Sequence, residues 1–328
     1  MAHPGELTLQ RRAGVTRDGW GSAGTGPDIP AVAGAFLARQ RLVVIAATDD
    51  TGAMWVTPLS GPPGYATARD EHTVVIDRLP EDGDPLHGLF GTERDIGMIA
   101  IEPAERRRMR VNGRARQDGT RLVIRTEQVY ANCPKYISTR TAEEESARVR
   151  GAATATDRLS GAQRRRISTA DTFFIGTAAP GLGADASHRG GRPGFVTVDG
   201  GRLTWPEYVG NAMYMTLGNL LLDPRCGLLF LDWEAGRTLH LTGRARIDDD
   251  PVRAATVPGA QRLIDFDVER VVEIDGGLPF AWTFGELFRH NPPVPPAGVR
   301  LAGARQAAST RSADSDGVNR YAPPRGMT

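Results

Sequence analysis

Six consecutive residues in the second half of the chain combine the side chains that hold an anionic group. Residues 187–192 read Ser-His-Arg-Gly-Gly-Arg, and so place Ser187, His188, Arg189 and Arg192 beside two glycines. A guanidinium group binds phosphate through two parallel N–H donors, while a hydroxyl and backbone amides supply further donors. The segment therefore predicts a phosphate site built from side chains. The alternative is a polar hairpin whose arginines meet only solvent.

A second polar segment, 211–219, lies further along the same half. It carries Asn211, Tyr214, Thr216 and Asn219 close to a glycine that lets a ligand approach the backbone. Amides and hydroxyls of this kind suit the polar edge of a heterocyclic ring or a phosphate group. The competing interpretation is an ordinary loop that leads into a short helix docked on the rest of the fold.

Three residues near these segments are weaker candidates. Trp205 follows the basic segment, and Trp233 follows the second polar segment. Either indole could contact a planar ligand, although packing in a hydrophobic core is the commoner role of a large aromatic side chain. His240 could face the same ligand, but a single histidine on a strand is more often structural. We retain Trp205 as a candidate and leave Trp233 and His240 open.

The first half of the chain contributes a dense basic run and a cysteine. Arg106–Arg110 contains four arginines. Such a run is usually a solvated strand edge or a surface at which the two halves pair. Alternatively, its arginines contact a bound phosphate from across the molecule. Cys133 precedes Lys135, whose positive charge favours a reactive thiolate, but no histidine or acidic residue lies near it in sequence. The sequence therefore assigns no catalytic residue.

An internal repeat supplies the elements that position these residues. Gly97–Arg116 aligns without gaps on Gly227–Arg246, at an offset of 130 residues, and both segments end in Gly-Arg-Ala-Arg. A constant register over a long span indicates two copies of one fold. The same offset aligns two further pairs of segments, Leu42–Thr48 with Thr172–Ala178 and Ser60–Thr67 with Gly190–Thr197.

Both copies have the patterns of β-strands. Short apolar runs such as Val43–Ala47 and Phe173–Thr177 are rich in β-branched and aromatic residues and end at turn residues. Helical patterns are short and include Ile29–Arg39 and Thr141–Val149. A content of Gly 39 and Pro 23 also favours a turn-rich protein. The sequence predicts a mainly β protein with two small, closed, mostly antiparallel barrels in tandem and a few short helices.

Polar stretches around the two copies define the remaining segments. The charged run after the first copy is typical of a linker helix with a solvated face. The residues after Asn291 are proline-rich and then polar, with too little apolar surface to order themselves. The predicted segments are an N-terminal extension (1–30), a first barrel (31–140), a charged linker (141–165), a second barrel with the ligand site (166–295) and a disordered tail (296–328).

The overall composition argues against several classes of protein. Lys+Arg 40 nearly balance Asp+Glu 39, for a net charge of +1, which disfavours nucleic acid or an anionic membrane as the main partner. The two cysteines form no disulfide framework, and no Cys/His cluster has the spacing of metal ligands. No apolar run has the length of a membrane span or of a signal-peptide core. We expect a cytoplasmic protein without a metal site.

Several short motifs follow one another along nearly the whole chain, from His3 to Trp282. In order they are His3-x-x-Glu6 with Gln10–Val15, Ser60–Tyr65, Arg106–Gly113, Asn132–Ile137, Ser187–Phe195, Trp205-Pro206, Asn211–Tyr214, Leu217–Leu220 and Leu241–Arg244. Each motif is modest alone. Their order and spacing resemble those of the pyridoxamine 5'-phosphate oxidase-like FMN-binding split barrels, in the branch whose chains hold two barrels in tandem.

The resemblance implies two tandem split β-barrels that form an intrachain pseudo-dimer, with FMN bound where two barrels meet. It implies an FMN-dependent oxidoreductase that acts on a small molecule. In place of the basic segment, the first half has Thr57–Pro62, which contains no arginine or histidine, so we expect one FMN per chain against the second barrel. The candidate cofactor-binding residues are Ser187, His188, Arg189, Arg192, Trp205, Asn211, Tyr214, Thr216 and Asn219.

Other functions stay open at this point. Related barrels imply a non-catalytic flavin or haem binding protein, or a reductase that uses a deazaflavin instead of FMN. The electron donor is NAD(P)H or a partner reductase, and association into a homodimer is a further option. The sequence does not identify the substrate.

Overall fold

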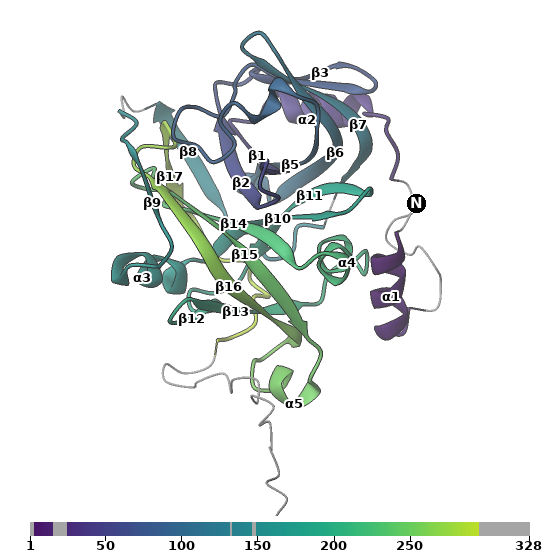
Figure 1. Cartoon of the computed structure of the whole chain (residues 1–328), viewed down its shortest axis with the longest axis vertical. Coiled ribbons are helices and arrows are strands. Elements are labelled where there is room, and N and C mark those ends of the chain that lie inside the picture. The colour runs from purple at the N-terminus through teal and green to yellow at the C-terminus, as the bar shows by residue number, and fades with distance from the viewer. Residues whose placement is uncertain (1–2, 16–24, 132, 146–148, 295–328) are drawn as a thin grey trace, which may run out of the picture.

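The computed structural model describes residues 3–15, 25–131, 133–145 and 149–294. It contains two large antiparallel sheets that pack against each other, with short helices at their edges (Figure 1). The mainly β fold with two tandem split barrels is thereby confirmed.

The first barrel is built from seven strands in the order β2-β1-β5-β6-β7-β4-β3. Helix α2 (Ala31–Ala38) precedes the sheet, and two 3-10 turns, η1 (Leu89–Gly91) and η2 (Pro103–Glu105), flank β5. The strands are β1 (Leu42–Thr48), β2 (Met54–Ser60), β3 (Ala66–Asp70), β4 (Thr73–Ile76), β5 (Arg94–Glu102), β6 (Arg107–Asp118) and β7 (Arg121–Ala131).

The second barrel has the corresponding order β11-β10-β14-β15-β16-β13-β12, with β9 (Ala153–Thr156) added beside β16. Its helices are α3 (Gly161–Thr169), α4 (Met215–Leu222) and α5 (Pro251–Ala254). Its other strands are β10 (Thr172–Ala179), β11 (Gly183–Gly190), β12 (Thr197–Asp199), β13 (Arg202–Tyr208), β14 (Arg225–Leu231), β15 (Thr238–Asp248) and β16 (Ala260–Ile274).

The internal repeat of the sequence is visible in the register of the strands. Each strand of the first barrel has a counterpart at the same place in the second. A β-bulge follows Asn112 in β6 and Thr242 in β15, which are equivalent positions of the repeat. The offset grows at β16, because α5 is inserted between β15 and β16 where the first barrel has a short turn.

The strands at the centre of each sheet bury side chains on both faces. In β1, Val43, Ile45 and Ala47 point into the core of the first barrel, whereas Val44 and Ala46 point into a separate core between the barrels. Successive side chains of a strand point to opposite faces, so a continuous apolar run serves two cores at once. This explains why residues 42–47 of β1 are all apolar and why the two barrels are joined by a hydrophobic interface.

The contact between the barrels is reciprocal. Strand β11 lies against β5 and β6, and its counterpart β2 lies against β14 and β15. Gly97 in β5 and Gly227 in β14 are equivalent, and a Cβ atom at either would collide with the backbone of the opposite barrel, at Asp185 and at Met54 respectively. The two halves thus pair as the subunits of a twofold dimer would.

The segment between the barrels differs from the expected linker helix. Residues predicted as helical within Thr141–Val149 instead belong to strand β8 (Arg140–Glu145), which pairs with β17 (Phe280–Phe284) in a two-stranded sheet. The helix prediction for this part is wrong, because pairing with a distant strand outweighs the local helical tendency of a charged run. The predicted disordered tail, 296–328, lies outside the described residues.

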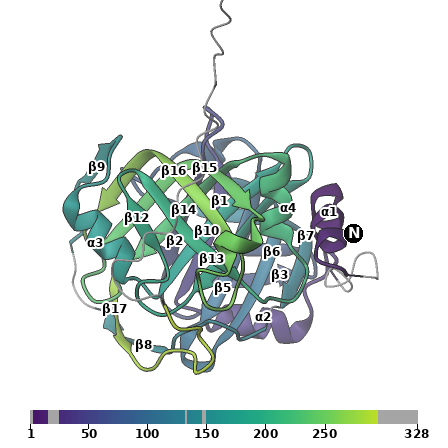
Figure 2. The same ribbon diagram turned by 90° about the horizontal axis from the view of Figure 1, so that it is seen from below.

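The N-terminal extension contains a helix that the sequence analysis did not anticipate. Helix α1 (Pro4–Arg12) lies beside α4 of the second barrel, and both ribbon views show the two together (Figures 1 and 2). The first residues of the chain therefore pack against its second half.

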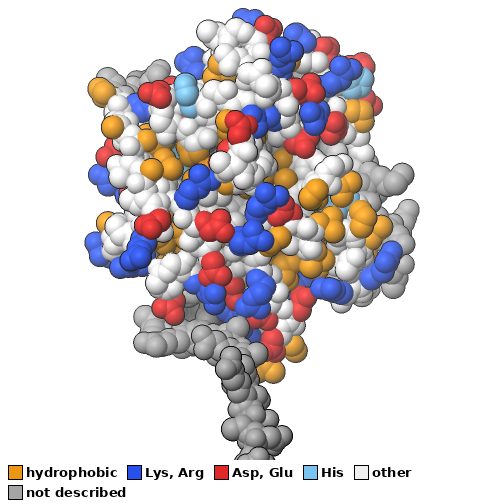
Figure 3. All heavy atoms as spheres, viewed as in Figure 1, with side chains coloured by type: hydrophobic (Ala, Val, Ile, Leu, Met, Phe, Trp, Pro, Cys, Tyr) orange, Lys and Arg blue, Asp and Glu red, His pale blue; other side chains and the backbone are white. Residues whose placement is uncertain are grey.

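The surface carries charges of both signs. Basic and acidic side chains are interspersed over the face shown in Figure 3, in keeping with the small net charge. In the part of the chain that the structure describes, no helix combines the length and apolarity needed to cross a membrane.

Candidate functional site

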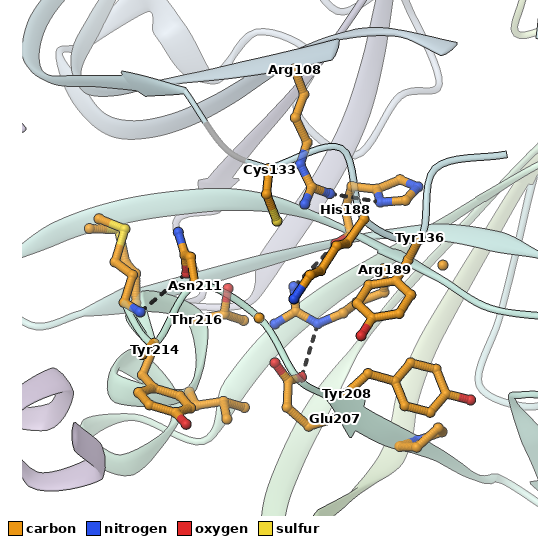
Figure 4. A pocket seen from close by; sticks show the side chains of 18 of the residues that line it. Arg108, Cys133, Tyr136, His188, Arg189, Glu207, Tyr208, Asn211, Tyr214 and Thr216 are labelled. Carbon is orange, nitrogen blue, oxygen red and sulfur yellow. Dashed lines mark hydrogen bonds and ion pairs between the residues drawn. The ribbon is translucent and has the colours of Figure 1, made fainter. Parts of the chain in front are cut away.

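A cavity lies where β11 and β13 of the second barrel face β6 of the first, and we call it the inter-barrel cavity (Figure 4). Its volume is about 90 Å³. The first half supplies Arg108, Arg110, Cys133, Lys135 and Tyr136 to its walls. The second half supplies His188, Arg189, Gly190, Phe195, Pro206, Glu207, Tyr208, Gly210, Asn211, Ala212, Met213, Tyr214, Met215, Thr216 and Leu217.

Strand geometry explains why the basic residues of the two halves meet. Arg108 and Arg110 are two residues apart on β6 and therefore share one face of that strand. This face is turned toward β11, which carries His188 and Arg189. Residues 211–216 close another side, between the end of β13 and the start of α4.

Arg108 fixes the tautomer of His188. A guanidinium nitrogen of Arg108 lies 3.0 Å from Nδ1 of His188. Since guanidinium can only donate, Nδ1 must accept, and the ring proton of a neutral imidazole is then on Nε2. Burial, followed by the positive charges of Arg108 and Arg189, holds the pKa of His188 well below its usual value. Among the described residues, the Nε2 donor has no hydrogen-bond partner.

The cavity has an excess of positive charge. Arg189 is neutralised by Glu207, with 3.1 Å between Nε and a carboxylate oxygen. Within the described residues, no carboxylate lies within ion-pair distance of Arg108 or Lys135. Burial, and then the positive charge of Arg110, lowers the pKa of Arg108 to about 10. An anion that enters the cavity would therefore be attracted to Arg108 and would stabilise its charged form.

A buried polar network forms the floor of the cavity. Asp185 on β11 is fully buried and accepts hydrogen bonds from Arg110 at 3.1 Å, from the Tyr130 hydroxyl at 3.0 Å and from Thr216 Oγ1 at 3.2 Å. Burial alone would lower the pKa of Arg110, but the charge of Asp185 raises it. A second nitrogen of Arg110 donates to Ser187. The network ties both barrels and the start of α4 together beneath the cavity.

The structure brings together five of the nine candidate residues. His188, Arg189, Asn211, Tyr214 and Thr216 all line the inter-barrel cavity.

Ser187 is not one of the cavity walls, but it contacts two residues that are. It is fully buried, and its hydroxyl accepts a hydrogen bond from Arg189 at 2.7 Å. Its role in this structure is to hold the two arginines, Arg110 and Arg189, that flank it.

The other three candidates lie elsewhere. Arg192 donates through Nε to the backbone carbonyl of Asn291 at 3.3 Å, away from the cavity walls. Trp205 belongs to the core of the second barrel. Asn219 is buried on α4, where its amide donates to Thr177 Oγ1 at 3.0 Å.

Sequence reasoning gave little weight to the first half of the chain and overlooked Asp185 and Glu207. A residue-by-residue comparison of the two copies would have found Asp185, because its equivalent in the repeat is the apolar residue Trp55. A carboxylate that replaces a core residue in one copy alone signals a polar partner.

The comparisons with known proteins agree with this fold. Residues 159–274 match the sequence family described as pyridoxamine 5'-phosphate oxidase. The match covers most of the second barrel and supports the family resemblance of the sequence. No curated protein matches the chain.

Solved structures are similar to only part of the chain. HupZ from Group A Streptococcus is 13% identical, with 34% of this chain and 92% of that chain covered and a TM-score of 0.29. An FAD-binding protein from Mesorhizobium loti is 12% identical, with 37% and 97% covered and a TM-score of 0.27. A conserved hypothetical protein from Mycobacterium tuberculosis is 18% identical, with 39% and 93% covered and a TM-score of 0.29.

Proposed function

We propose that the inter-barrel cavity binds the phosphate of FMN and that the protein is an FMN-dependent oxidoreductase acting on a small molecule. The observation that carries this proposal is Arg108, a largely enclosed cation without a carboxylate partner among the described residues. A phosphate would supply the missing negative charge and accept two parallel hydrogen bonds from its guanidinium group.

The size of the cavity sets a limit on how FMN fits. Its volume of about 90 Å³ is well below the roughly 300–1,000 Å³ of sites that enclose a whole small molecule. The enclosed part therefore suits a phosphate group, and a flavin ring would remain at the mouth. Tyr136 and Tyr214 are half-buried there and offer aromatic surface to a planar ring (Figure 4).

The chain's own residues would act by binding and charge stabilisation. Bound FMN supplies hydride or electron transfer. Arg108 and Lys135 contribute positive charge, and His188 offers a neutral N–H donor instead of an imidazolium. These groups favour an anionic ligand without consuming a proton.

Cofactor analysis tests the proposal directly. The purified protein should show an oxidised-flavin absorbance spectrum, and mass spectrometry of the released compound should give FMN. A haem Soret band, or a deazaflavin in the mass spectrum, would replace FMN by one of the alternative ligands.

A pair of arginine variants tests the proposed phosphate contact. Arg108→Ala should weaken FMN binding about 10- to 100-fold, the loss typical of one charge-assisted contact. Arg116→Ala is the matched control, because Arg116 is an exposed residue of the same strand β6. Riboflavin lacks the phosphate, so its affinity should be nearly the same in the parent protein and in Arg108→Ala. Equal loss for FMN and riboflavin would contradict a phosphate contact.

A further inference from the structure

The N-terminal helix α1 is anchored at its first turn. His3 accepts a hydrogen bond from the Gly5 amide at 3.2 Å, and the Glu6 side chain accepts one from the His3 amide at 3.2 Å. This reciprocal cap satisfies two amides that a helix start leaves without partners. Pro4 at the first helical position adds a preset backbone angle. Such a start specifies where a nine-residue helix begins.

Two glycines let α1 approach α4 more closely than side chains would permit. A Cβ atom at Gly5 would collide with the backbone carbonyl of Gly218, and one at Gly218 would come within 2.7 Å of the Glu6 nitrogen. Both glycines have ordinary backbone angles here, so their role is the close approach and not a special conformation. The position of α1 on the second barrel is therefore fixed tightly.

Docked in this way, α1 places Gln10 against one wall of the inter-barrel cavity. The Gln10 side chain is 1% exposed. Its amide nitrogen donates to the carbonyl oxygens of Ala212 at 3.2 Å and Met213 at 3.4 Å. These carbonyls belong to the segment 211–216 that lines the cavity.

The contacted segment has a conformation that needs support. Ala212 and Tyr214 have φ of 60° and 59°, in the left-handed region that residues with side chains rarely adopt. The Tyr214 carbonyl also accepts the Gly218 amide at 2.7 Å, so this backbone begins α4. Hydrogen bonds from outside the segment are a means of holding such a backbone in place.

We propose that Gln10 is a positioning residue that holds segment 211–216 as a wall of the inter-barrel cavity, so that ligand binding there depends on the N-terminal helix. The ligand part of this inference rests on the proposed FMN function. The positioning part does not, because it concerns the backbone of the ligand-free protein.

Two variants of Gln10 remove its donors in different ways. Gln10→Met keeps the length of the side chain and its neutrality but removes the amide group. Gln10→Glu keeps the shape of the side chain but replaces the amide nitrogen by oxygen. Thr8→Ala is the control, since the Thr8 hydroxyl donates to the Pro4 carbonyl of the same helix in an exposed hydrogen bond. Thermal melting of the full-length variants separates local effects from loss of the fold.

Hydrogen exchange of the ligand-free protein is the deciding measurement. Amides of 212–216 should exchange about tenfold faster in both Gln10 variants, as expected for the loss of one or two hydrogen bonds, while the strands of both barrels keep their protection. Thr8→Ala should leave the segment unchanged. Unchanged exchange of 212–216 in both variants, or an increase spread over the whole molecule, would overturn the positioning role.

FMN titration then separates this inference from the proposed function. If the parent protein binds FMN, both Gln10 variants should bind it about tenfold more weakly, and unaltered affinity would overturn the dependence on α1. If the parent protein binds no FMN, the proposed function fails. The exchange measurement still decides whether Gln10 holds the wall.

Discussion

The inter-barrel cavity has a counterpart in the other half of the pseudo-dimer, and the two differ in chemistry. The counterpart, which we call the first-half cavity, has a volume of about 190 Å³ and is lined by Pro58, Leu59, Ser60, Gly61, Arg78, Leu79, Pro80, Glu81, Asp84, Arg150, Gly276, Gly277 and Pro279. At the repeat offset, its Pro58 and Leu59 correspond to His188 and Arg189.

Near the first-half cavity, the positions equivalent to the basic residues carry polar groups that bond within the fold. The equivalents of Arg108 and Arg110 are Thr238 and His240. His240 is fully buried, and its ring nitrogens lie 2.8 Å from the Val56 carbonyl and 2.8 Å from Thr238 Oγ1. Asp84 occupies the position of Tyr214 and accepts a hydrogen bond from Thr57. At these equivalent positions the first half pairs its polar groups within the fold. Among the described residues of the second half, by contrast, Arg108 has no carboxylate partner and Nε2 of His188 has no hydrogen-bond partner.

This difference indicates that the repeat specifies the barrels and not the ligand chemistry. Residues that both halves share, such as the interface glycines, serve the pairing of the barrels. Residues found in one half alone are the better candidates for binding. The expectation of one FMN per chain follows from this reasoning and stays a prediction.

The largest expected effect comes from the buried ion pair beneath the inter-barrel cavity. Asp185→Asn leaves the buried Arg110 without its counter-charge, and removing one member of such a pair costs about 3–5 kcal/mol of unfolding free energy. Asp84→Asn in the first-half cavity should cost less, about 1–2 kcal/mol, because its oxygen accepts from a neutral hydroxyl and a backbone amide. Denaturant unfolding of both variants gives the comparison, and equal losses would contradict it.

The second largest effect concerns ligand affinity. Arg189→Ala removes a cation whose equivalent in the first half is the apolar residue Leu59, and FMN affinity should fall about 10-fold or more. Arg78→Ala is its matched control, because Arg78 is the exposed arginine of the first-half cavity. Fluorescence titration should find the control unchanged. Similar losses in both variants would point to a general charge effect and against a single specific site.

The loss of stability in acid should differ between the parent protein and variants of the buried histidine near each cavity. Burial lowers the pKa of both His188 and His240, so the unfolded chain binds protons that the folded chain does not as pH falls below about 6.5. Each histidine should therefore cost up to about 1.4 kcal/mol of stability per pH unit below that value. His188→Gln and His240→Gln should each flatten the loss between pH 7 and pH 5. A variant with the parent's slope would show that its histidine is not buried as a neutral ring.

The fold was largely predictable because its strands follow local patterns and its repeat keeps one register over long segments. Elements that depend on distant contacts were not. Helix α1 is short and requires Gly218, and strand β8 requires β17 as a partner. Neither partner can be identified from the local sequence.

The candidate site was predictable only as separate segments. The segments 187–192 and 211–219 were found because polar residues are dense in them, and both reach the cavity. Their pairing with Arg108 and Arg110 depends on how the two barrels dock, which no local pattern reveals. Strand β11 also ends at Gly190, so the chain turns before Arg192 and takes that residue away from the cavity.

The smallest expected effect tests this last difference between sequence and structure. Sequence reasoning treats Arg189 and Arg192 as equivalent phosphate ligands, whereas the structure places only Arg189 among the cavity walls. Arg192→Ala should therefore leave FMN affinity within about twofold of the parent, because it removes one partly buried hydrogen bond to the Asn291 carbonyl, worth about 0.5–1.5 kcal/mol of stability. Titration of Arg192→Ala and Arg189→Ala under the same conditions compares the two arginines directly. A loss of FMN affinity in Arg192→Ala as large as that in Arg189→Ala would mean that the segment 187–192 rearranges around the ligand, and that the ligand reaches beyond the inter-barrel cavity.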